Sequence, residues 1–173
     1  MDDRRKSLLA KRDAIPFEQR RLFSKSICDG IISSEQYKSS KNIMCYAAIG
    51  SEVMLDTLIE HCVKSGKRVL LPVCDKQTHT MVARFYDSRL TKGAYGIDEP
   101  DGEIGIPDLI ICPMLAFNKD RYRIGYGAGY YDRYLEKSNA VFFGAAFSVQ
   151  KADFSPEDHD IPLHRIYTQE EIF

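Results

Sequence analysis

The chain alternates between helical stripes of apolar residues and short unbroken apolar runs. Residues 2–14 have a helical pattern with Leu8 and Leu9 on the buried side, and Pro16 breaks that pattern. A second helix is expected to follow. Its apolar stripe, at spacings of four residues, consists of Phe23, Ile27 and Ile31. Both helices should therefore cover a core with one face.

Four apolar runs have the length of strands that are covered on both faces. They are residues 43–49, 68–73, 108–113 and 140–147. The stretch 79–86 alternates well enough to form a further strand. In contrast, the stretch 90–105 is rich in Gly, Asp and Pro, so we expect a loop or a pair of turns there. These runs predict an α/β protein with a mostly parallel sheet.

A helical pattern from about Met54 to Ser65 joins the first two runs, and Gly66 marks its end. Its inward residues are expected to be Leu55, Leu58, Ile59, Cys62 and Val63. Strand, helix and strand in this order predict a right-handed parallel crossover. Glu52 should then lie at the carboxyl end of a parallel strand, where α/β folds place ligands. Position alone leaves two interpretations open for Glu52, a ligand contact or an ordinary acid in the first turn of a helix.

Composition and charge exclude several classes of protein. The 173 residues are 44% hydrophobic, which suits one domain, 1–173, with a substantial core. A balance of 24 Lys and Arg against 25 Asp and Glu gives no overall attraction to nucleic acid or to an anionic membrane. Five cysteines without a C-x-x-C pair indicate neither a disulfide framework nor a zinc site. These cysteines fit a reducing cytosol, and with no apolar leader and no long apolar run we expect a soluble protein. The expected assembly state is a monomer.

The most informative stretch is Arg123–Tyr134, in which glycines alternate before a helical pattern. Gly125, Gly127 and Gly129 lack Cβ atoms, so the backbone can adopt positive φ and turn its N–H groups toward one ligand. The helix that follows would point its positive end at the same place. These features predict a phosphate site.

The spacing of this stretch differs from that of two familiar nucleotide motifs. It lacks the last glycine of G-x-G-x-x-G, and no Lys followed by Ser or Thr completes a P-loop. A flexible turn between a strand and a helix is the alternative. The neighbouring residues favour the phosphate site, because Asp132 offers a hard oxygen ligand for Mg²⁺ and tyrosines supply stacking surface. Fixed positive charge comes from Arg121, Arg123 and Arg133.

Two other regions have open interpretations. Tyr95, in the glycine-rich loop, either stacks on a flat ligand or anchors the loop on the core. Acids and histidines at 157–164 form either a metal site or a solvated turn, and their spacing matches no zinc pattern. None of the four histidines has a recognisable nucleophile partner, which argues against covalent hydrolysis.

These motifs resemble those of the 5-formyltetrahydrofolate cyclo-ligase family over nearly the whole chain. The most specific match is residues 123–135, where the glycine-rich stretch runs into Gly-Tyr-Tyr-Asp. Further matches occur in the right order at Gly50–Val53, Leu71-Pro72, Tyr95–Pro100, Asp108–Pro113 with Phe117, and His159–Pro162.

The resemblance implies a three-layer α/β/α fold and an ATP-dependent reaction. That reaction converts 5-formyltetrahydrofolate to 5,10-methenyltetrahydrofolate, ADP and phosphate, with Mg²⁺ as cofactor. The implied ATP contacts are Arg4, Arg5, Arg123, Ile124, Gly125, Tyr126, Gly127, Ala128, Gly129, Tyr130 and Tyr131. The implied folate contacts are Ala47, Glu52, Tyr95, Tyr126 and Tyr130, and the implied Mg²⁺ ligands are Asp132 and Asp160. The expected catalytic residues are Arg123, Tyr130 and Asp132.

Two other functions stay open at this point. Similar α/β/α folds host phosphosugar isomerases and CoA-transferases, although no base and nucleophile pair supports them here. A non-catalytic folate or nucleotide binder is the second, because Met1 and Ala128 stand where the family often has other residues near phosphate. The expected partners are small molecules, without nucleic acid or membrane.

Overall fold

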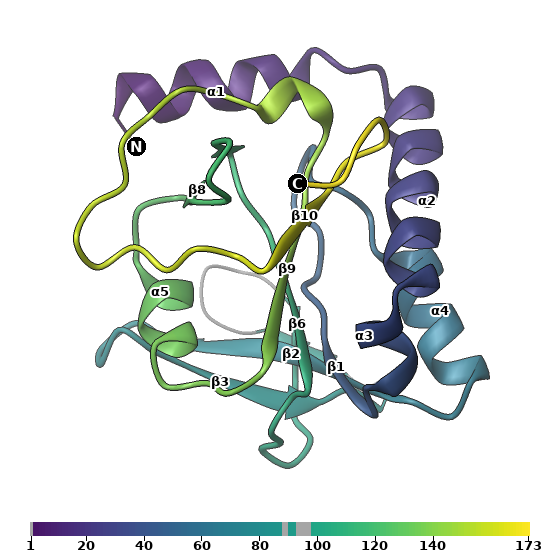
Figure 1. The fold of residues 1–173 in the computed structure, drawn as a ribbon. Coiled ribbons are helices and arrows are strands. Elements are labelled where there is room, and N and C mark those ends of the chain that lie inside the picture. Colours follow the sequence, from purple (N-terminus) through teal and green to yellow (C-terminus); the bar gives the residue numbers. More distant parts are fainter. Residues whose placement is uncertain (1, 88–89, 93–97) are drawn as a thin grey trace.

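A six-stranded sheet forms the centre of the molecule in the computed structural model, which describes residues 2–87, 90–92 and 98–173. Its strands lie in the order β10-β9-β6-β1-β2-β3 (Figure 1). They are β1 (Asn42–Met44), β2 (Arg68–Asp75), β3 (Thr80–Phe85), β6 (Leu109–Cys112), β9 (Val141–Ala145) and β10 (Arg165–Tyr167). Only the β2–β3 pair of this sheet is antiparallel, so the prediction of a mostly parallel sheet is confirmed.

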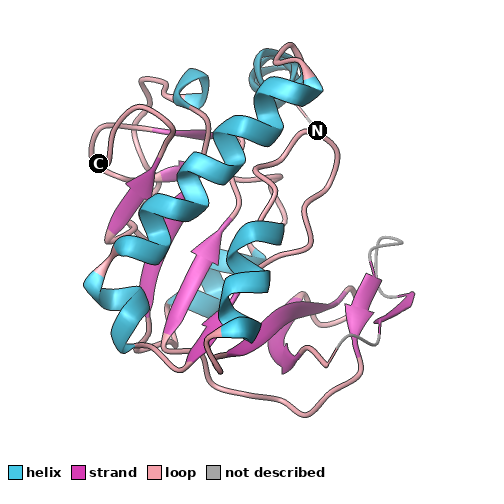
Figure 2. Cartoon of the chain, turned by 90° about the vertical axis from the view of Figure 1, so that its right-hand side faces the viewer, coloured by secondary structure: helices cyan, strands magenta, loops and turns pink. Residues whose placement is uncertain are grey.

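Helices cover both faces of this sheet. One face packs against α2 (Phe17–Ser33), α3 (Glu35–Ser39) and α4 (Asp56–Lys64), and its core includes Ile27, Leu58 and Leu109. Figure 2 shows α2 running across this face. On the other face, Leu135 of α5 (Tyr130–Leu135) packs with Ile110 and Phe142. The three-layer α/β/α fold is confirmed.

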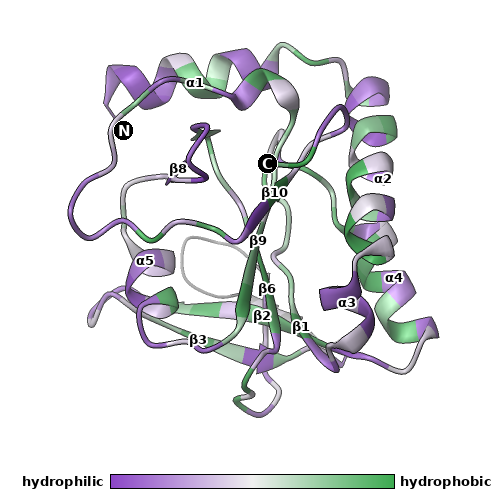
Figure 3. Ribbon diagram, in the orientation of Figure 1, coloured by the Kyte–Doolittle hydropathy of each residue, from purple (hydrophilic) through white to green (hydrophobic). Residues whose placement is uncertain are grey.

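Hydropathy follows these layers. In Figure 3 the central strands are hydrophobic along much of their length, whereas the helices alternate between hydrophilic and hydrophobic positions. Strand β6 shows why, because all four of its residues are buried. A strand that is covered on both faces gains stability from apolar side chains at every position, whereas a covering helix needs only one apolar stripe. Among the described residues, no helix is both long and apolar enough to cross a membrane.

The first helix, α1 (Asp3–Asp13), lies at one end of the sheet. It begins where the side chain of Asp2 accepts a hydrogen bond from the N–H of Arg5. Leu8 packs on Leu115 and Ala116, which follow the carboxyl end of β6. The short hairpin of β7 (Ala116–Phe117) and β8 (Arg123–Ile124) carries the chain from there into the glycine-rich stretch. Helix α1 thus closes the carboxyl end of the sheet.

Several local predictions are wrong. Val63 is 65% exposed, because α4 faces the sheet with Leu58 and Cys62 and Val63 lies about 100° around the helix from Cys62. The run 43–49 is a strand only as far as Met44, and the chain then leaves the sheet toward Glu52. Part of the expected loop at 90–105 forms an antiparallel pair, β4 (Leu90–Lys92) and β5 (Asp98–Pro100).

Candidate functional site

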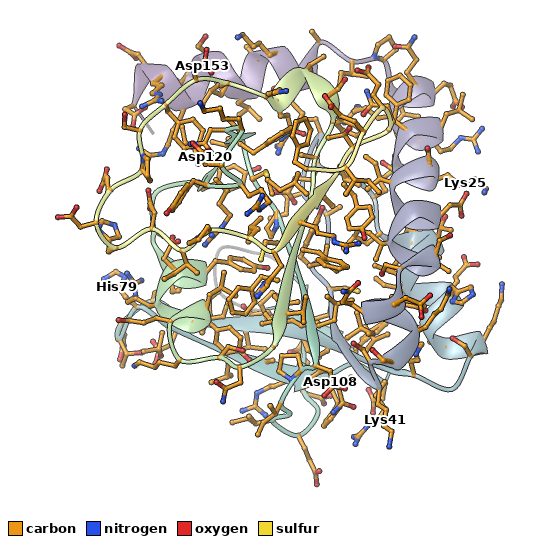
Figure 4. All side chains as sticks on the ribbon, in the orientation of Figure 1. Lys25, Lys41, His79, Asp108, Asp120 and Asp153 are labelled. Carbon is orange, nitrogen blue, oxygen red and sulfur yellow. The ribbon has the colours of Figure 1, made fainter. Side chains whose placement is uncertain are left out.

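A cavity of about 830 Å³ opens between α1, the glycine-rich stretch and β2. It lies at the carboxyl end of the parallel strands. Asp108 and Lys41, labelled in Figure 4, immediately precede β6 and β1 and mark the opposite end of the molecule from α1. This is the place where open α/β sheets bind ligands.

The cavity brings together every site residue implied by the family resemblance that lies in the described part of the chain. They are Arg4, Arg5, Ala47, Glu52, Arg123, Ile124, Gly125, Tyr126, Gly127, Ala128, Gly129, Tyr130, Tyr131, Asp132 and Asp160. Tyr95 lies outside the described residues. Residues from both termini and from the middle of the sequence therefore meet in one cavity.

We call the stretch 123–129 the cradle. Its three glycines have different backbone conformations. Gly127 has φ of 99° and Gly129 has φ of 67°, both in the region that favours glycine. Gly125 does not have positive φ, and a Cβ atom added there would meet nothing within 4 Å. An added Cβ at Gly129 would lie 2.7 Å from a guanidinium nitrogen of Arg133. The expectation of positive φ thus holds at two of the three positions.

Helix α5 holds the cradle in place and provides only a weak helix dipole for a bound anion. It has six residues, too few for the strong helix end that the sequence suggested. Arg133 of this helix donates to the carbonyl oxygen of Ala128 at 2.7 Å and to that of His79 at 3.0 Å. His79 is labelled beside α5 in Figure 4. The cradle is consequently held to the turn before β3.

Two of the three flanking arginines do not face the cavity. Arg133 binds the carbonyl groups just described, and Arg121 donates to the carbonyl of Leu163 at 3.0 Å. Neither side chain lines the cavity, so the prediction that these two arginines supply charge to a ligand is wrong. Arg121 and Arg133 bind backbone carbonyl groups instead. A long cationic side chain can readily donate to a carbonyl group near the protein surface that has no other partner.

Arg123 is buried and holds the carboxylate of Asp132. Its guanidinium donates to Asp132 Oδ1 at 2.8 Å and to the carbonyl of Ile161 at 3.0 Å. This ion pair positions Asp132 at the cavity wall and ties the C-terminal segment to the cradle. The charge of Arg123 is therefore largely balanced before any ligand binds.

Positive charge at the cavity comes instead from α1. Arg5 donates from Nε to the carbonyl of Gly125 at 3.1 Å and forms an ion pair with Asp2. Arg4 lies over the ring of Phe154, 5.5 Å from its centroid, at the cavity wall. Arg5 thus keeps its guanidinium next to the cradle and Arg4 lies at the wall of the same cavity, which suits an anionic ligand.

Glu52 is a buried carboxylate in the cavity, only 4% exposed. Its Oε2 accepts from the N–H of Ile49 at 2.9 Å, and its Oε1 accepts from the hydroxyl of Tyr126 at 3.0 Å. Burial raises the pKa of Glu52, while these hydrogen bonds and the charge of Arg12 oppose that shift. Because α4 begins only at Asp56, Glu52 is not an acid of its first turn, and the ligand interpretation is the one that the geometry favours.

Sequence reasoning missed Arg12, which is 1% exposed and reaches Tyr126 from α1. One signal was available. Arg12 lies four residues after Leu8 on the face of α1 that points to the protein, where a charged residue needs polar partners. Glu99 was also missed. It is 8% exposed, lines the cavity and accepts from the N–H of Cys74 at 3.2 Å.

Tyr131 contributes a hydroxyl whose oxygen is buried and has no hydrogen-bond partner among the described residues. The residue lines the cavity. Burial raises the pKa of Tyr131 well above its ordinary value, so the phenol is neutral and can donate or accept. An unsatisfied hydroxyl of this kind is available to a ligand.

Two carboxylates at the cavity wall are suited to a hard cation. Asp132 is held by Arg123, and one oxygen of Asp160 accepts from the N–H of Glu157 at 2.8 Å. Across the described residues, no group of three or more His, Cys, Asp or Glu side chains is arranged to hold a metal ion. Mg²⁺ commonly binds through one or two carboxylates together with phosphate oxygens and water, so this donor set fits Mg²⁺ only when a phosphate ligand is also present.

Comparison with known proteins decides the family. A family model described as the 5-formyltetrahydrofolate cyclo-ligase family matches residues 2–169. The chain belongs to this family. Among curated cyclo-ligases, the Mus musculus protein is 32% identical over 77% of this chain and 72% of its own length. The Haemophilus influenzae cyclo-ligase is 30% identical over 82% of each chain.

Solved structures of 5,10-methenyltetrahydrofolate synthetases have the same fold as this cyclo-ligase family member. The Aquifex aeolicus protein has a TM-score of 0.84 at 32% identity, over 97% of this chain and 89% of its own. The Mycoplasma pneumoniae protein has a TM-score of 0.81 at 27% identity, over 98% and 100% of the two chains. The family resemblance inferred from the glycine-rich motif is confirmed.

Proposed function

We propose that this chain catalyses the ATP-dependent ring closure of 5-formyltetrahydrofolate to 5,10-methenyltetrahydrofolate, with release of ADP and phosphate. The observation that carries the proposal is the position of Tyr126. This residue belongs to the cradle and donates to Glu52, so a phosphate-binding loop and a buried carboxylate share one cavity. A phosphoryl donor and a nitrogen heterocycle would then meet within it.

The nucleotide half of the cavity is the cradle together with α1. Gly127 and Gly129 allow the backbone conformations that turn N–H groups toward an anion. Arg4 and Arg5 supply guanidinium groups at the same wall. We assign the triphosphate of ATP to this half, with Ile124, Ala128 and Tyr131 as further contacts.

The folate half is the region of Ala47, Glu52 and the apolar wall of Leu71 and Met81. A carboxylate oxygen has two lone pairs, and each oxygen of Glu52 accepts one internal hydrogen bond. The remaining lone pairs suit the N–H donors of a pterin ring, and the apolar wall suits its faces. We assign the pterin to Glu52, with Tyr126 and Tyr130 between the two substrates.

The reaction needs a better leaving group than hydroxide. The oxygen of the N5-formyl group attacks the γ-phosphorus of ATP, the bond from that phosphorus to the β–γ bridging oxygen breaks, and ADP leaves. N10 then attacks the formyl carbon, and the C–O bond breaks to release inorganic phosphate. Loss of the N10 proton leaves the methenyl bridge. Catalysis of such a transfer rests on positioning and charge neutralisation rather than on a covalent intermediate with the protein.

Asp132 and Asp160 would hold Mg²⁺ together with the phosphates. When bound, the ion supplies positive charge against the phosphate oxygens. The chain's own part is to keep Asp132 in place through Arg123 and to keep Asp160 in its turn with Glu157. Tyr130, whose hydroxyl donates to the carbonyl of Asp75 at 3.4 Å, would close the wall between the substrates.

An assay of both products tests the proposal. The protein is incubated with ATP, Mg²⁺ and 5-formyltetrahydrofolate, and ADP and the methenyl absorbance are followed together. Equal amounts of both products are expected, with neither formed when one substrate is omitted. ADP without methenyl product would indicate another phosphoryl acceptor, and binding of both ligands without products would indicate a non-catalytic binder. Glu52→Gln serves as the matched control and should form both products more slowly at limiting 5-formyltetrahydrofolate.

A further inference from the structure

The buried guanidinium of Arg12 joins three separate segments. Its Nε donates to the hydroxyl of Ser51 at 2.9 Å, and its two terminal nitrogens donate to the carbonyl of Met114 at 3.1 Å and to the hydroxyl of Tyr126 at 2.8 Å. Arg12 is 1% exposed, and burial of an unpaired charge would cost much free energy. These three contacts therefore stabilise the guanidinium in one position. The third of them reaches the cavity.

We propose that Arg12 is a positioning residue for the folate half of the cavity. By donating to Tyr126, it directs the Tyr126 O–H toward Glu52 and keeps Glu52 a charged acceptor for the substrate. This inference rests on the proposed function, because it assigns the pterin to Glu52. It adds a residue that does not touch the substrate but acts through Glu52.

The direction of the hydrogen bonds follows from the donors that each group has. A guanidinium has only donors, so the Tyr126 oxygen must accept from Arg12. The phenol has one proton, which is then free to point at Glu52 Oε1. The other oxygen of Glu52 already accepts from the backbone of Ile49. A carboxylate that accepts at both oxygens is satisfied when it is ionised, and the chain Arg12–Tyr126–Glu52 therefore favours that state.

Charge acts in the same direction. Burial raises the pKa of Glu52, and the positive charge of Arg12 and the hydrogen bond from Tyr126 lower it. Tyr46 and Tyr131 also face Glu52, and burial raises the pKa of each well above its ordinary value, so both are neutral. Asp13 accepts a hydrogen bond from the hydroxyl of Ser51, to which Arg12 donates. Asp13 is thus linked to Arg12 through Ser51 and not through Tyr126. Removing Arg12 should therefore make Glu52 easier to protonate.

The test is the affinity for 5-formyltetrahydrofolate, measured by calorimetry without ATP from pH 5 to pH 9. Wild-type affinity should fall at low pH as Glu52 takes up a proton. Arg12→Met should move the midpoint of this fall to higher pH and weaken binding near pH 6 by about tenfold. Arg12→Lys keeps the charge and should move the midpoint less. The ligand's own carboxylates titrate alike in every series, so differences belong to the protein.

Tyr126→Phe tests the connection itself. It removes the link while leaving Arg12 bound to Ser51 and Met114, and it should move the midpoint in the same direction. Since the two residues act in one chain, the double variant Arg12→Met/Tyr126→Phe should be no weaker than the weaker single variant. Additive losses would overturn the proposal. If Arg12→Met does not fold, Tyr126→Phe still tests the proposal. An unchanged midpoint in Tyr126→Phe would then overturn it.

Ser51→Ala is the matched control. It removes one acceptor of Arg12 but leaves the link to Tyr126, so it should keep the wild-type midpoint even if it lowers Tm. An equal midpoint shift in Ser51→Ala and Arg12→Met would mean that Arg12 acts only through the fold, and would overturn the proposal. Wild-type protein that binds no 5-formyltetrahydrofolate contradicts the proposed function instead, whereas normal wild-type binding with an unchanged midpoint in the Arg12 variants contradicts this inference alone.

Discussion

The two halves of the cavity are built in different ways. The cradle is made of backbone, with positive φ at Gly127 and Gly129 and carbonyl groups held by arginines. The folate half is made of buried side chains, in which Glu52 depends on Tyr126 and Tyr126 on Arg12. A backbone site needs particular residues next to one another in sequence, whereas a side-chain site needs residues that only the fold brings together. The two halves should consequently respond differently to substitution.

The largest effect is expected from Glu52→Gln. An amide has one acceptor oxygen and no charge, so it cannot accept from the pterin edge as a carboxylate does. Hydrogen bonds to a charged group are worth roughly 1.5–3 kcal/mol, which corresponds to a loss of about 10- to 150-fold in folate affinity. ATP affinity should stay near wild type. Titration of each ligand separately measures both, and a loss confined to ATP would place Glu52 on the wrong ligand.

The next effect separates the glycines within the cradle. Gly127→Ala forces a side chain into a conformation with φ of 99°, at a cost of about 1–2 kcal/mol, and should weaken ATP binding by about tenfold. Gly125→Ala meets no neighbour and should leave Tm unchanged. ATP titrations and thermal melts of the two variants provide the comparison. Equal tolerance at both positions would mean that the stretch is only a turn.

A change at Asp132 tests the metal site that the proposed function places beside the phosphates. Asp132→Asn keeps the shape and an acceptor for Arg123 but removes a hard anionic ligand. We expect the Mg²⁺ concentration needed for half-maximal turnover to rise by about tenfold, with little change in folate affinity. Wild-type activity at limiting Mg²⁺ would remove Asp132 from the metal site.

The smallest effect is on stability. Because the folded pKa of Glu52 is raised, its folded form holds the proton to higher pH than its unfolded form does. Its contribution to stability is therefore fully present below the ordinary glutamate pKa and is lost as pH rises through the folded pKa. The Tm of wild type minus that of Glu52→Gln should fall between pH 4 and pH 8. A difference that rises with pH would contradict the raised pKa.

Much of the fold could be predicted from local patterns. The apolar stripe with Ile27 and Ile31 predicts a helix with one covered face, and both residues lie in the core. The four apolar runs predict strands that are covered on both faces, and each run overlaps a strand of the sheet. Strand β10 escaped prediction, because three residues at Arg165–Tyr167 carry too little periodicity to distinguish a strand from a turn. Helix α3 is five residues long and is favoured by Ser34, whose side chain accepts from the N–H of Tyr37. Short elements depend on their tertiary surroundings more than on their own pattern.

The site was predictable to different degrees in its two halves. Gly127 and Gly129 stand out because few residues other than glycine suit positive φ. Glu52 was visible by its position. Arg12 was missed, because the helical pattern of residues 2–14 does not show that its guanidinium reaches the hydroxyl of Tyr126. Arg121 and Arg133 show the reverse error, because proximity in sequence to the cradle did not bring their side chains to the cavity.

The contact between Arg5 and the carbonyl of Gly125 spans 120 positions in the chain, and that between Arg12 and Tyr126 spans 114. During synthesis, α1 leaves the ribosome long before its partners in the cradle exist. The nascent chain can bury α2 and α4 against early strands, but the binding cavity can close only when residues beyond 126 have emerged. Contacts of such high sequence separation are slow to form. A ribosome-bound fragment that stops before residue 123 should therefore leave α1 undocked and open to protease.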